Sequence, residues 1–270
     1  MSKIIEMGRK YSKKIVYILS LLLLCLVLSW WICALPNTNN TNPNQQIIAL
    51  SGQLLLNVKS ELSTDSVELA LAKIKTEELV AGLSNDEARK TFWINIYNAY
   101  FQILSLREKK GKGEIFKVKA ICIAQTKFSL DDIEHGILRK YRWKLSMGYL
   151  PQFCPLKIIR QLSVSNIDFR IHFSLNCGAK SCPPIAYYEY AHIDEQLDLA
   201  TLAFLNTETE IDLTKKVVKV PKLMWWFKGD FGGKEGINTI LKKYVKKELP
   251  DNYSIQYQDY DWTEQLKNYK

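Results

Sequence analysis

Residues 84–103, SNDEARKTFWINIYNAYFQI, form the stretch around which the predicted fold is built. Ser84 is followed three residues later by Glu87, which matches the capping box at the start of many helices. Apolar side chains then recur at helical spacing, at Ala88, Phe92, Ile96, Tyr100 and Ile103. The pattern predicts a helix with a broad apolar face, which a domain of this size buries in its core.

The rest of the chain contains both predicted helices and predicted strands. Helical spacing recurs in residues 129–141, 193–205 and 235–247, and also before the central helix, in residues 65–81. Strands are predicted at residues 115–123, 168–176 and 253–257, with a short hairpin over 210–220. Because helices outnumber strands and do not alternate regularly with them, we predict an α+β fold, with helices packed on a small, mainly antiparallel sheet.

The N-terminal region predicts attachment to a membrane. Residues 15–35 contain no charged side chain and are long enough to cross a bilayer as one helix. Residues 1–14 are basic and are predicted to form a cytoplasmic tail, which places the rest of the chain on the non-cytoplasmic side. A cleaved signal peptide is the alternative, although its apolar region is normally shorter. Residues 36–46 are Asn-rich and predict a flexible tether, followed by one soluble domain over residues 47–270.

Composition excludes several classes of protein. The formal net charge is +9, and residues 1–14 contribute five basic side chains against Glu6, so the remainder carries +9 − 4 = +5. No basic stretch is interleaved with aromatic side chains, which disfavours a nucleic-acid partner. Six cysteines in 270 residues are too few for a disulfide-dense miniprotein. Neither a cofactor nor a metal site is predicted.

Two asparagines interrupt the apolar face of the central helix. Asn95 and Asn98 are one turn apart in FWINIYNAYF, residues 92–101. A buried amide requires hydrogen-bond partners. Each asparagine therefore either ties a loop backbone to the helix, or lines a site and positions a polar substrate or a catalytic histidine.

A second group of polar side chains lies in SLDDIEHGILR, residues 129–139. Glu134 is near the apolar face of the predicted helix, where a carboxylate needs a cationic partner. His135 shares its side of the helix with Asp131 and Arg139. The group is either a capped surface cluster or part of a site.

The third group is RIHFSLNCGAKSCPP, residues 170–184. Strict alternation over 168–176 predicts a strand with His172 on its polar face, ending next to Cys177. A cysteine at such a junction, with a histidine within reach, suits nucleophilic catalysis. A disulfide among Cys122, Cys154, Cys177 and Cys182 is chemically allowed in three pairings, and a zinc site is a further alternative. Trp225 and Trp226, with Asp230, are either core residues or a platform for stacking sugars.

Together these motifs resemble the family catalogued as domain of unknown function 547. The matching stretches are FWINIYNAY, SLDDIEHGILR, RIHFSLNCGAKSCPP, WWFKGDF and DYDW, which run from about residue 85 to 262. The resemblance singles out Asn95, Asn98, Glu134, His135, Arg139, His172, Cys177, Gly178, Ser181 and Cys182. It implies a fold group and no established reaction. Similar plant proteins look intracellular, which favours a reactive or metal-binding thiol over a structural disulfide.

The function predicted from these observations is a membrane-tethered cysteine-dependent hydrolase or acyltransferase acting at the cell envelope. Cys177 is the expected nucleophile, His172 or His135 the base, and Glu134 or Asn98 the group that orients the base. Asn95, Arg139, Gly178 and Ser181 are the expected substrate-binding residues. The alternative is a non-catalytic binding module that recruits a protein or an envelope polymer. The expected ligand is a small molecule, a peptide or an envelope polymer.

Overall fold

The computed structural model describes residues 16–17, 20, 42–107 and 113–269. The chain divides into two compact units, one of residues 1–36 with 153–156 and a larger one of residues 37–152 with 157–270. The membrane anchor predicted over residues 15–35 lies outside the described residues except for Val16, Tyr17 and Ser20, which are helical and exposed. Within the described part of the chain, no helix is both long and apolar enough to span a bilayer.

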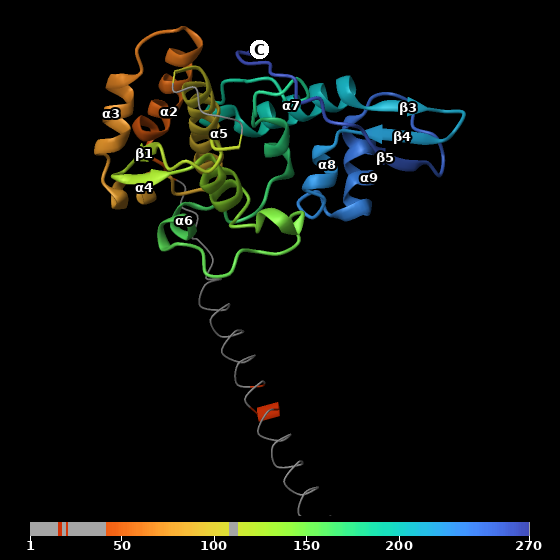
Figure 1. Cartoon of the computed structure of the whole chain (residues 1–270), viewed down its shortest axis with the longest axis horizontal. Coiled ribbons are helices and arrows are strands. Elements are labelled where there is room, and N and C mark those ends of the chain that lie inside the picture. Colours follow the sequence, from red (N-terminus) through yellow and green to blue (C-terminus); the bar gives the residue numbers. More distant parts are fainter. Residues whose placement is uncertain (1–15, 18–19, 21–41, 108–112, 270) are drawn as a thin grey trace, which may run out of the picture. The chain divides into compact units, whose positions relative to one another are not determined.

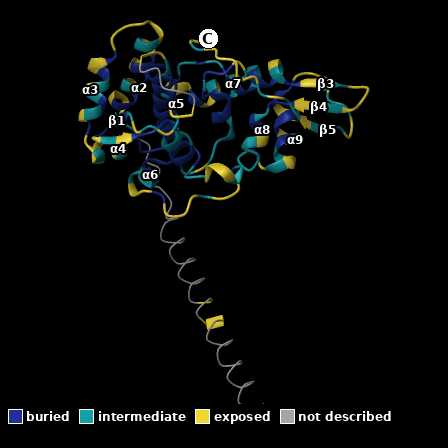
Figure 2. Ribbon diagram, in the orientation of Figure 1, coloured by how far each residue is buried: buried dark blue, intermediate teal, exposed yellow. Residues whose placement is uncertain are grey.

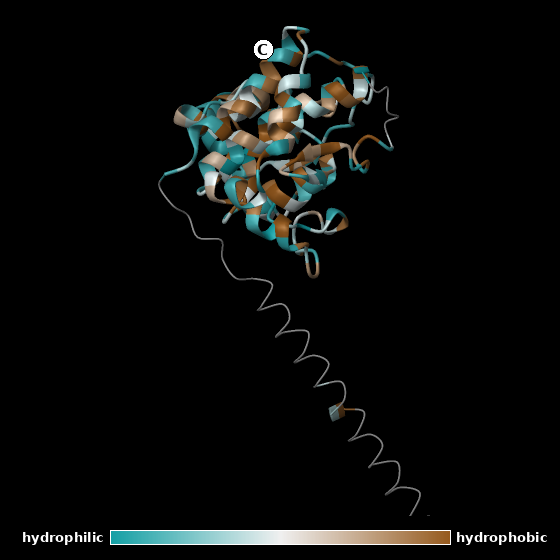
Figure 3. Cartoon of the chain, turned by 90° about the vertical axis from the view of Figure 1, so that its left-hand side faces the viewer, coloured by the Kyte–Doolittle hydropathy of each residue, from teal (hydrophilic) through white to brown (hydrophobic). Residues whose placement is uncertain are grey.

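The first half of the larger unit is built around helix α5, Asp86–Gln102 (Figure 1). Every residue from Ala88 to Gln102 is buried, so the helix is enclosed on all sides, as the dark blue ribbon shows (Figure 2). Helix α2, Gln45–Lys59, packs along α5. Helices α3, Asp65–Lys73, and α4, Thr76–Gly82, lie beside them, and the hairpin of β1, Ile121–Ile123, and β2, Thr126–Phe128, contacts α3. Figure 3 shows that hydrophilic and hydrophobic residues both occur on the helices of this unit.

A second hydrophobic cluster forms around the C-terminal elements. Helix α7, Ile193–Glu208, leads into β3, Glu210–Asp212, and β4, Val217–Val220. Helices α8, Leu223–Trp226, and α9, Gly233–Tyr244, follow, and β5, Ser254–Tyr257, closes the sheet. β4 pairs antiparallel with β3 and parallel with β5. The α+β class is confirmed, but the strands form two small sheets, one of which is mixed.

Several element boundaries differ from the sequence-based predictions. Helix α5 is capped by Asn85, whose side chain accepts the Ala88 N–H, so the cap is one residue later than the predicted Ser84. The helix predicted over residues 65–81 is divided at Ile74, whose backbone is extended. Helix α2 begins at Gln45 with Asn44 as its cap, so the last two residues of the predicted tether, 45–46, are helical.

The strand predicted over residues 168–176 is wrong. Residues Phe169–Phe173 form a 3₁₀ helix, η4, which packs against α7. Asp168 caps it by accepting the Arg170 N–H, and the Ile171 N–H bonds to the Asp168 carbonyl. Because the backbone groups find local partners and both sides of the segment are covered, the alternation of apolar and polar residues does not lead to a strand.

Candidate functional site

A cavity of about 520 Å³ is lined by residues of both hydrophobic clusters of the larger unit, the one around α5 and the one around the C-terminal elements. Helix α5 contributes Tyr97 to its wall, and the π-helix η2, Asp132–Leu138, contributes Glu134 and His135. His172 and Cys177 also line it. The remaining wall contains six aromatic residues, Phe116, Trp225, Trp226, Phe227, Tyr260 and Trp262. It also contains the charged residues Asp131 and Lys144 and five apolar ones, Leu145, Met147, Leu175, Pro183 and Leu223. Four of the five predicted catalytic residues therefore meet at one cavity.

Asn98, the fifth, is fully buried behind the cavity wall rather than on it. Its side chain donates to the Ser174 carbonyl and accepts the Asn176 N–H, each at 2.9 Å. Asn95 makes the same pair of bonds to the backbone of Tyr188, at 2.8 and 3.1 Å. Both asparagines thus tie a loop backbone to the helix. Of the two alternatives for these residues, this is the structural role and not the lining of a site.

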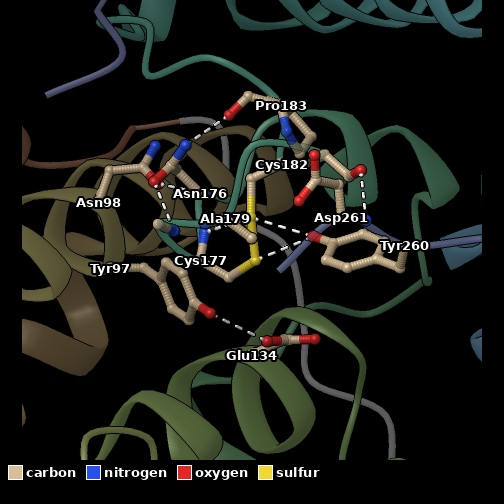
Figure 4. The surroundings of a disulfide bond; sticks show 12 residues. Tyr97, Asn98, Glu134, Asn176, Cys177, Ala179, Cys182, Pro183, Tyr260 and Asp261 are labelled. Atoms are coloured by element: carbon tan, nitrogen blue, oxygen red, sulfur yellow. Dashed lines mark hydrogen bonds between the residues drawn. A yellow bond between two sulfur atoms is a disulfide. The ribbon is translucent and has the colours of Figure 1, made fainter. Parts of the chain in front are cut away.

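The sulfur atoms of Cys177 and Cys182 form a disulfide (Figure 4). This bond belongs to one of the three pairings of the four cysteines, but the second bond of that pairing, Cys122–Cys154, is not formed. In this oxidised form Cys177 carries no thiol, and its sulfur contacts the Tyr260 hydroxyl at 3.0 Å. Within the described residues, no hydrogen bond joins the Cys177 sulfur to a histidine. The same residues contain no group of three or more side chains placed to bind a metal ion.

Glu134 is one of the ionised groups of the cavity wall, which also contains Asp131 and Lys144. Its side chain is 13% exposed, and its carboxylate accepts a hydrogen bond of 3.2 Å from the Tyr97 hydroxyl. Burial raises the pKa of Glu134, but its neighbours, among them the Arg139 guanidinium and the Tyr97 hydroxyl, leave the pKa below its ordinary value. Burial and the carboxylate of Glu134 raise the pKa of Tyr97, so its phenol keeps the proton that it donates.

The π-helix brings His135 against Arg139. The Arg139 N–H bonds to the carbonyl of Glu134, five residues earlier, which is the wide spacing of a π-turn. The Arg139 guanidinium donates to Nδ1 of His135 at 2.7 Å. Burial lowers the pKa of His135, so the ring is neutral and carries its proton on Nε2. His135 can therefore donate a hydrogen bond but has no free nitrogen with which to accept a proton.

Asp230 holds this group together, and the sequence analysis did not assign it that role. Its buried carboxylate accepts from Arg139 Nε at 2.5 Å and from His172 Nε2 at 2.9 Å. Burial opposes ionisation, yet the hydrogen bonds from His172 and Arg139 lower the pKa of Asp230 to about 2. Phe227 stacks on the His172 ring at 4.1 Å. The sequence signals at this position were its place beside Trp225 and Trp226 and its inclusion in the stretch WWFKGDF, neither of which indicated a partner for Arg139.

The predicted substrate-binding residues lie around the cavity rather than in it. Arg139 is fully buried against Asp230, and Asn95 is likewise buried. Gly178 lines a smaller cavity of about 180 Å³, which shares Cys177, Phe116 and Trp262 with the larger one. The Ser181 hydroxyl accepts the Asp261 N–H at 2.9 Å.

That last bond attaches a segment that we call the C-terminal strap, residues 258–269. Its backbone pairs with the disulfide loop, since the N–H groups of Lys180 and Gln265 bond across to Thr263 and Gly178. The strap carries Tyr260 and Trp262, whose rings contact Trp226 with centroids 4.7 and 5.7 Å away. Trp225 and Trp226 reach the cavity as the platform hypothesis requires, whereas the Asp230 side chain is fully buried.

A family model described as "Protein of unknown function, DUF547" matches residues 80–205. This region is a DUF547 domain. The match runs from before α5 into α7, so Glu134, His135, His172 and the disulfide of this DUF547 domain all lie within it. Asp230 lies beyond it, and so does the C-terminal strap, whose Tyr260 and Trp262 line the cavity. No curated protein matches the chain. No solved structure matches it either.

Proposed function

We propose that the cavity of this DUF547 domain binds an amine-bearing organic group, as a small molecule or as the end of a peptide or envelope polymer. The observation that carries the proposal is an aromatic cavity with an ionised carboxylate in its wall. Arg139 is paired with the buried Asp230, and the lowered pKa of Glu134 keeps its carboxylate ionised at neutral pH. Asp131 pairs with Lys144 at 2.9 Å, so this second carboxylate is neutralised.

The aromatic wall suits the same kind of ligand. Trp225 and Trp262 are 42% and 52% exposed, which is unusual for tryptophan in a folded domain. The faces of indole and phenol rings attract cations, and they also stack on the apolar faces of ring-shaped ligands. An amine attached to an apolar or ring-shaped body therefore finds both of its partners in this cavity.

Replacing Glu134 by glutamine tests the proposal. We expect phenethylamine to quench tryptophan fluorescence of the full chain, and the variant to bind it about tenfold more weakly, because a charge-assisted hydrogen bond is replaced by a neutral one. Glu195→Gln is the matched control, since that side chain is 82% exposed on α7. Phenylacetate, which has a carboxylate in place of the amine, should not bind. Equal binding of the two compounds, or equal affinity of the two variants, contradicts the proposal.

A cysteine-dependent hydrolase or acyltransferase is the second candidate. It is favoured by the presence of Cys177, His172 and Glu134 in the wall of one cavity. Activity of this kind requires the disulfide to be reduced first, because the nucleophile is a thiolate. A thioester on Cys177, found by mass spectrometry after the reduced chain is treated with an activated ester, would establish it. Acylation spread evenly over the cysteines would exclude it.

We further propose that residues 15–35 anchor the protein in a membrane, with the cavity on the non-cytoplasmic side. The support is the length of the uncharged stretch and the basic residues before it. We expect the mature protein to retain these residues and to partition with the membrane fraction. Mass spectrometry of the mature chain decides the matter, because a start near Pro36 would mean that the segment is a cleaved signal peptide.

A further inference from the structure

We propose that the Cys177–Cys182 disulfide is a thiol–disulfide exchange site, at which a thiol-bearing ligand attacks Cys177 and Cys182 is the leaving group. The proposal concerns an activity separate from amine binding and does not depend on it. Three features of the described residues support it, namely the access to each sulfur, the hydrogen-bond donors around Cys182, and the position of Tyr260.

Access differs between the two cysteines. Cys177 is half-buried and lines both the larger and the smaller cavity. Cys182 is 3% exposed and lines neither. Thiolates attack disulfides at a sulfur that they can reach. A ligand in either cavity therefore meets Cys177, and the bond that breaks releases Cys182.

The surroundings of Cys182 stabilise the charge that this step creates. Its sulfur accepts the backbone N–H groups of Cys177 and Ala179, at 3.1 and 3.4 Å. Gly178, with φ at +71°, allows the turn that brings both N–H groups to one side, and a Cβ there would lie 2.6 Å from the Phe101 ring. Hydrogen bonds to a thiolate lower its pKa, and a leaving thiol of lower pKa departs faster.

Tyr260 supplies a third donor from the C-terminal strap. Its hydroxyl lies 3.0 Å from the Cys177 sulfur and 3.1 Å from the Cys182 sulfur, so it serves whichever carries the charge (Figure 4). Burial, together with Glu134, raises the pKa of Tyr260. The phenol therefore keeps its proton and remains a donor throughout the exchange.

The step balances without any further reactant. The ligand thiol first loses its proton to solvent, and its thiolate forms a new S–S bond to Cys177. The electron pair of the old S–S bond stays on Cys182, which becomes the thiolate. The ligand sulfur is thereby oxidised, and the protein disulfide is the oxidant. The product is a mixed disulfide on Cys177 next to a reduced Cys182.

Trapping this mixed disulfide tests the inference. The full chain, purified in detergent, is exposed briefly to 2-mercaptoethanol, a neutral thiol that is independent of any charge preference of the cavity. Acid quenching, maleimide labelling and peptide mapping then locate the adduct and the free thiol. We expect the adduct on Cys177 and the label on Cys182. An adduct on Cys182, or no adduct on the folded chain when the unfolded chain reacts, overturns the proposal.

Tyr260→Phe tests the donor, with Tyr253→Phe as its control. Tyr253 belongs to the same C-terminal region, and its hydroxyl has no hydrogen-bond partner within the described residues. Loss of one donor to the leaving thiolate should slow adduct formation about tenfold in Tyr260→Phe and leave the control unchanged. The difference in rate between the two variants should be the same at every pH. The pH changes the ionisation of the incoming thiol, whereas the phenol acts on the leaving thiolate. Equal rates in the two variants would contradict the role of the phenol.

Discussion

Replacing Asp230 by asparagine is expected to lower the free energy of unfolding by about 3–5 kcal/mol, because it leaves a buried arginine without its counter-charge. The Arg139 and Asp230 side chains are both fully buried, and one carboxylate oxygen serves Arg139 and His172 together. Asparagine keeps the shape of the side chain and removes the charge. Chemical denaturation followed by tryptophan fluorescence measures the effect.

The same carboxylate makes stability depend on pH in the acid range. The pKa of Asp230 is about 2 in the folded protein, below the value of about 3.9 for an unfolded chain. A group whose pKa is lowered by folding stabilises the protein above its unfolded pKa, and this stabilisation is lost as the pH falls through the folded pKa. About 2 kcal/mol should therefore disappear between about pH 4 and pH 2, and Asp230→Asn should lack this portion of the loss.

Asp251→Asn is the control for both measurements, since Asp251 is exposed on the loop before β5. It should unfold at the same denaturant concentration as the unchanged protein. If Asp230→Asn behaves like Asp251→Asn, then Arg139 has another counter-charge and the assigned role of Asp230 is wrong.

Replacing Asn98 by alanine is expected to destabilise the protein by about 2–4 kcal/mol, because two buried backbone groups lose their partners. The effect should also reach the disulfide loop. Asn98 holds the backbone of Asn176, and the Asn176 side chain in turn accepts from Gly178 N–H at 2.9 Å and donates to the Pro183 carbonyl at 2.7 Å. Loss of the first bond loosens the positions of the two cysteines.

Asn95→Ala provides a matched comparison from the same helix. It removes the equivalent pair of bonds, which Asn95 makes to the backbone of Tyr188. The free energy of unfolding should therefore fall by a similar amount. Because Tyr188 does not line the cavity, thiol exchange at Cys177 should stay unchanged in this variant and change in Asn98→Ala. Rates that fall equally in both would mean that Asn98 has no specific influence on the disulfide loop.

The elements that the sequence predicted well are those governed by local periodicity. The central helix, α7, α9 and the hairpin of β3 and β4 lie close to their predicted positions, because apolar spacing and turn residues act over a few residues. The segment of residues 168–176 shows the limit of this reasoning. Its alternation suits a strand, but a strand also needs a neighbour to pair with, and η4 packs against a helix instead.

By itself, the sequence determined which polar residues belong together: Glu134, His135, His172 and Cys177 were chosen from their motifs, and they meet at one cavity. Tertiary structure alone decided how they are connected. Arg139 and Asp230 pair across 91 residues, and Tyr260 reaches Cys177 across 83. Such contacts depend on the packing of whole elements, which no local pattern records. The choice of Cys182 as the partner of Cys177 is of this kind, because the sequence left any of the other three soluble cysteines open as its partner.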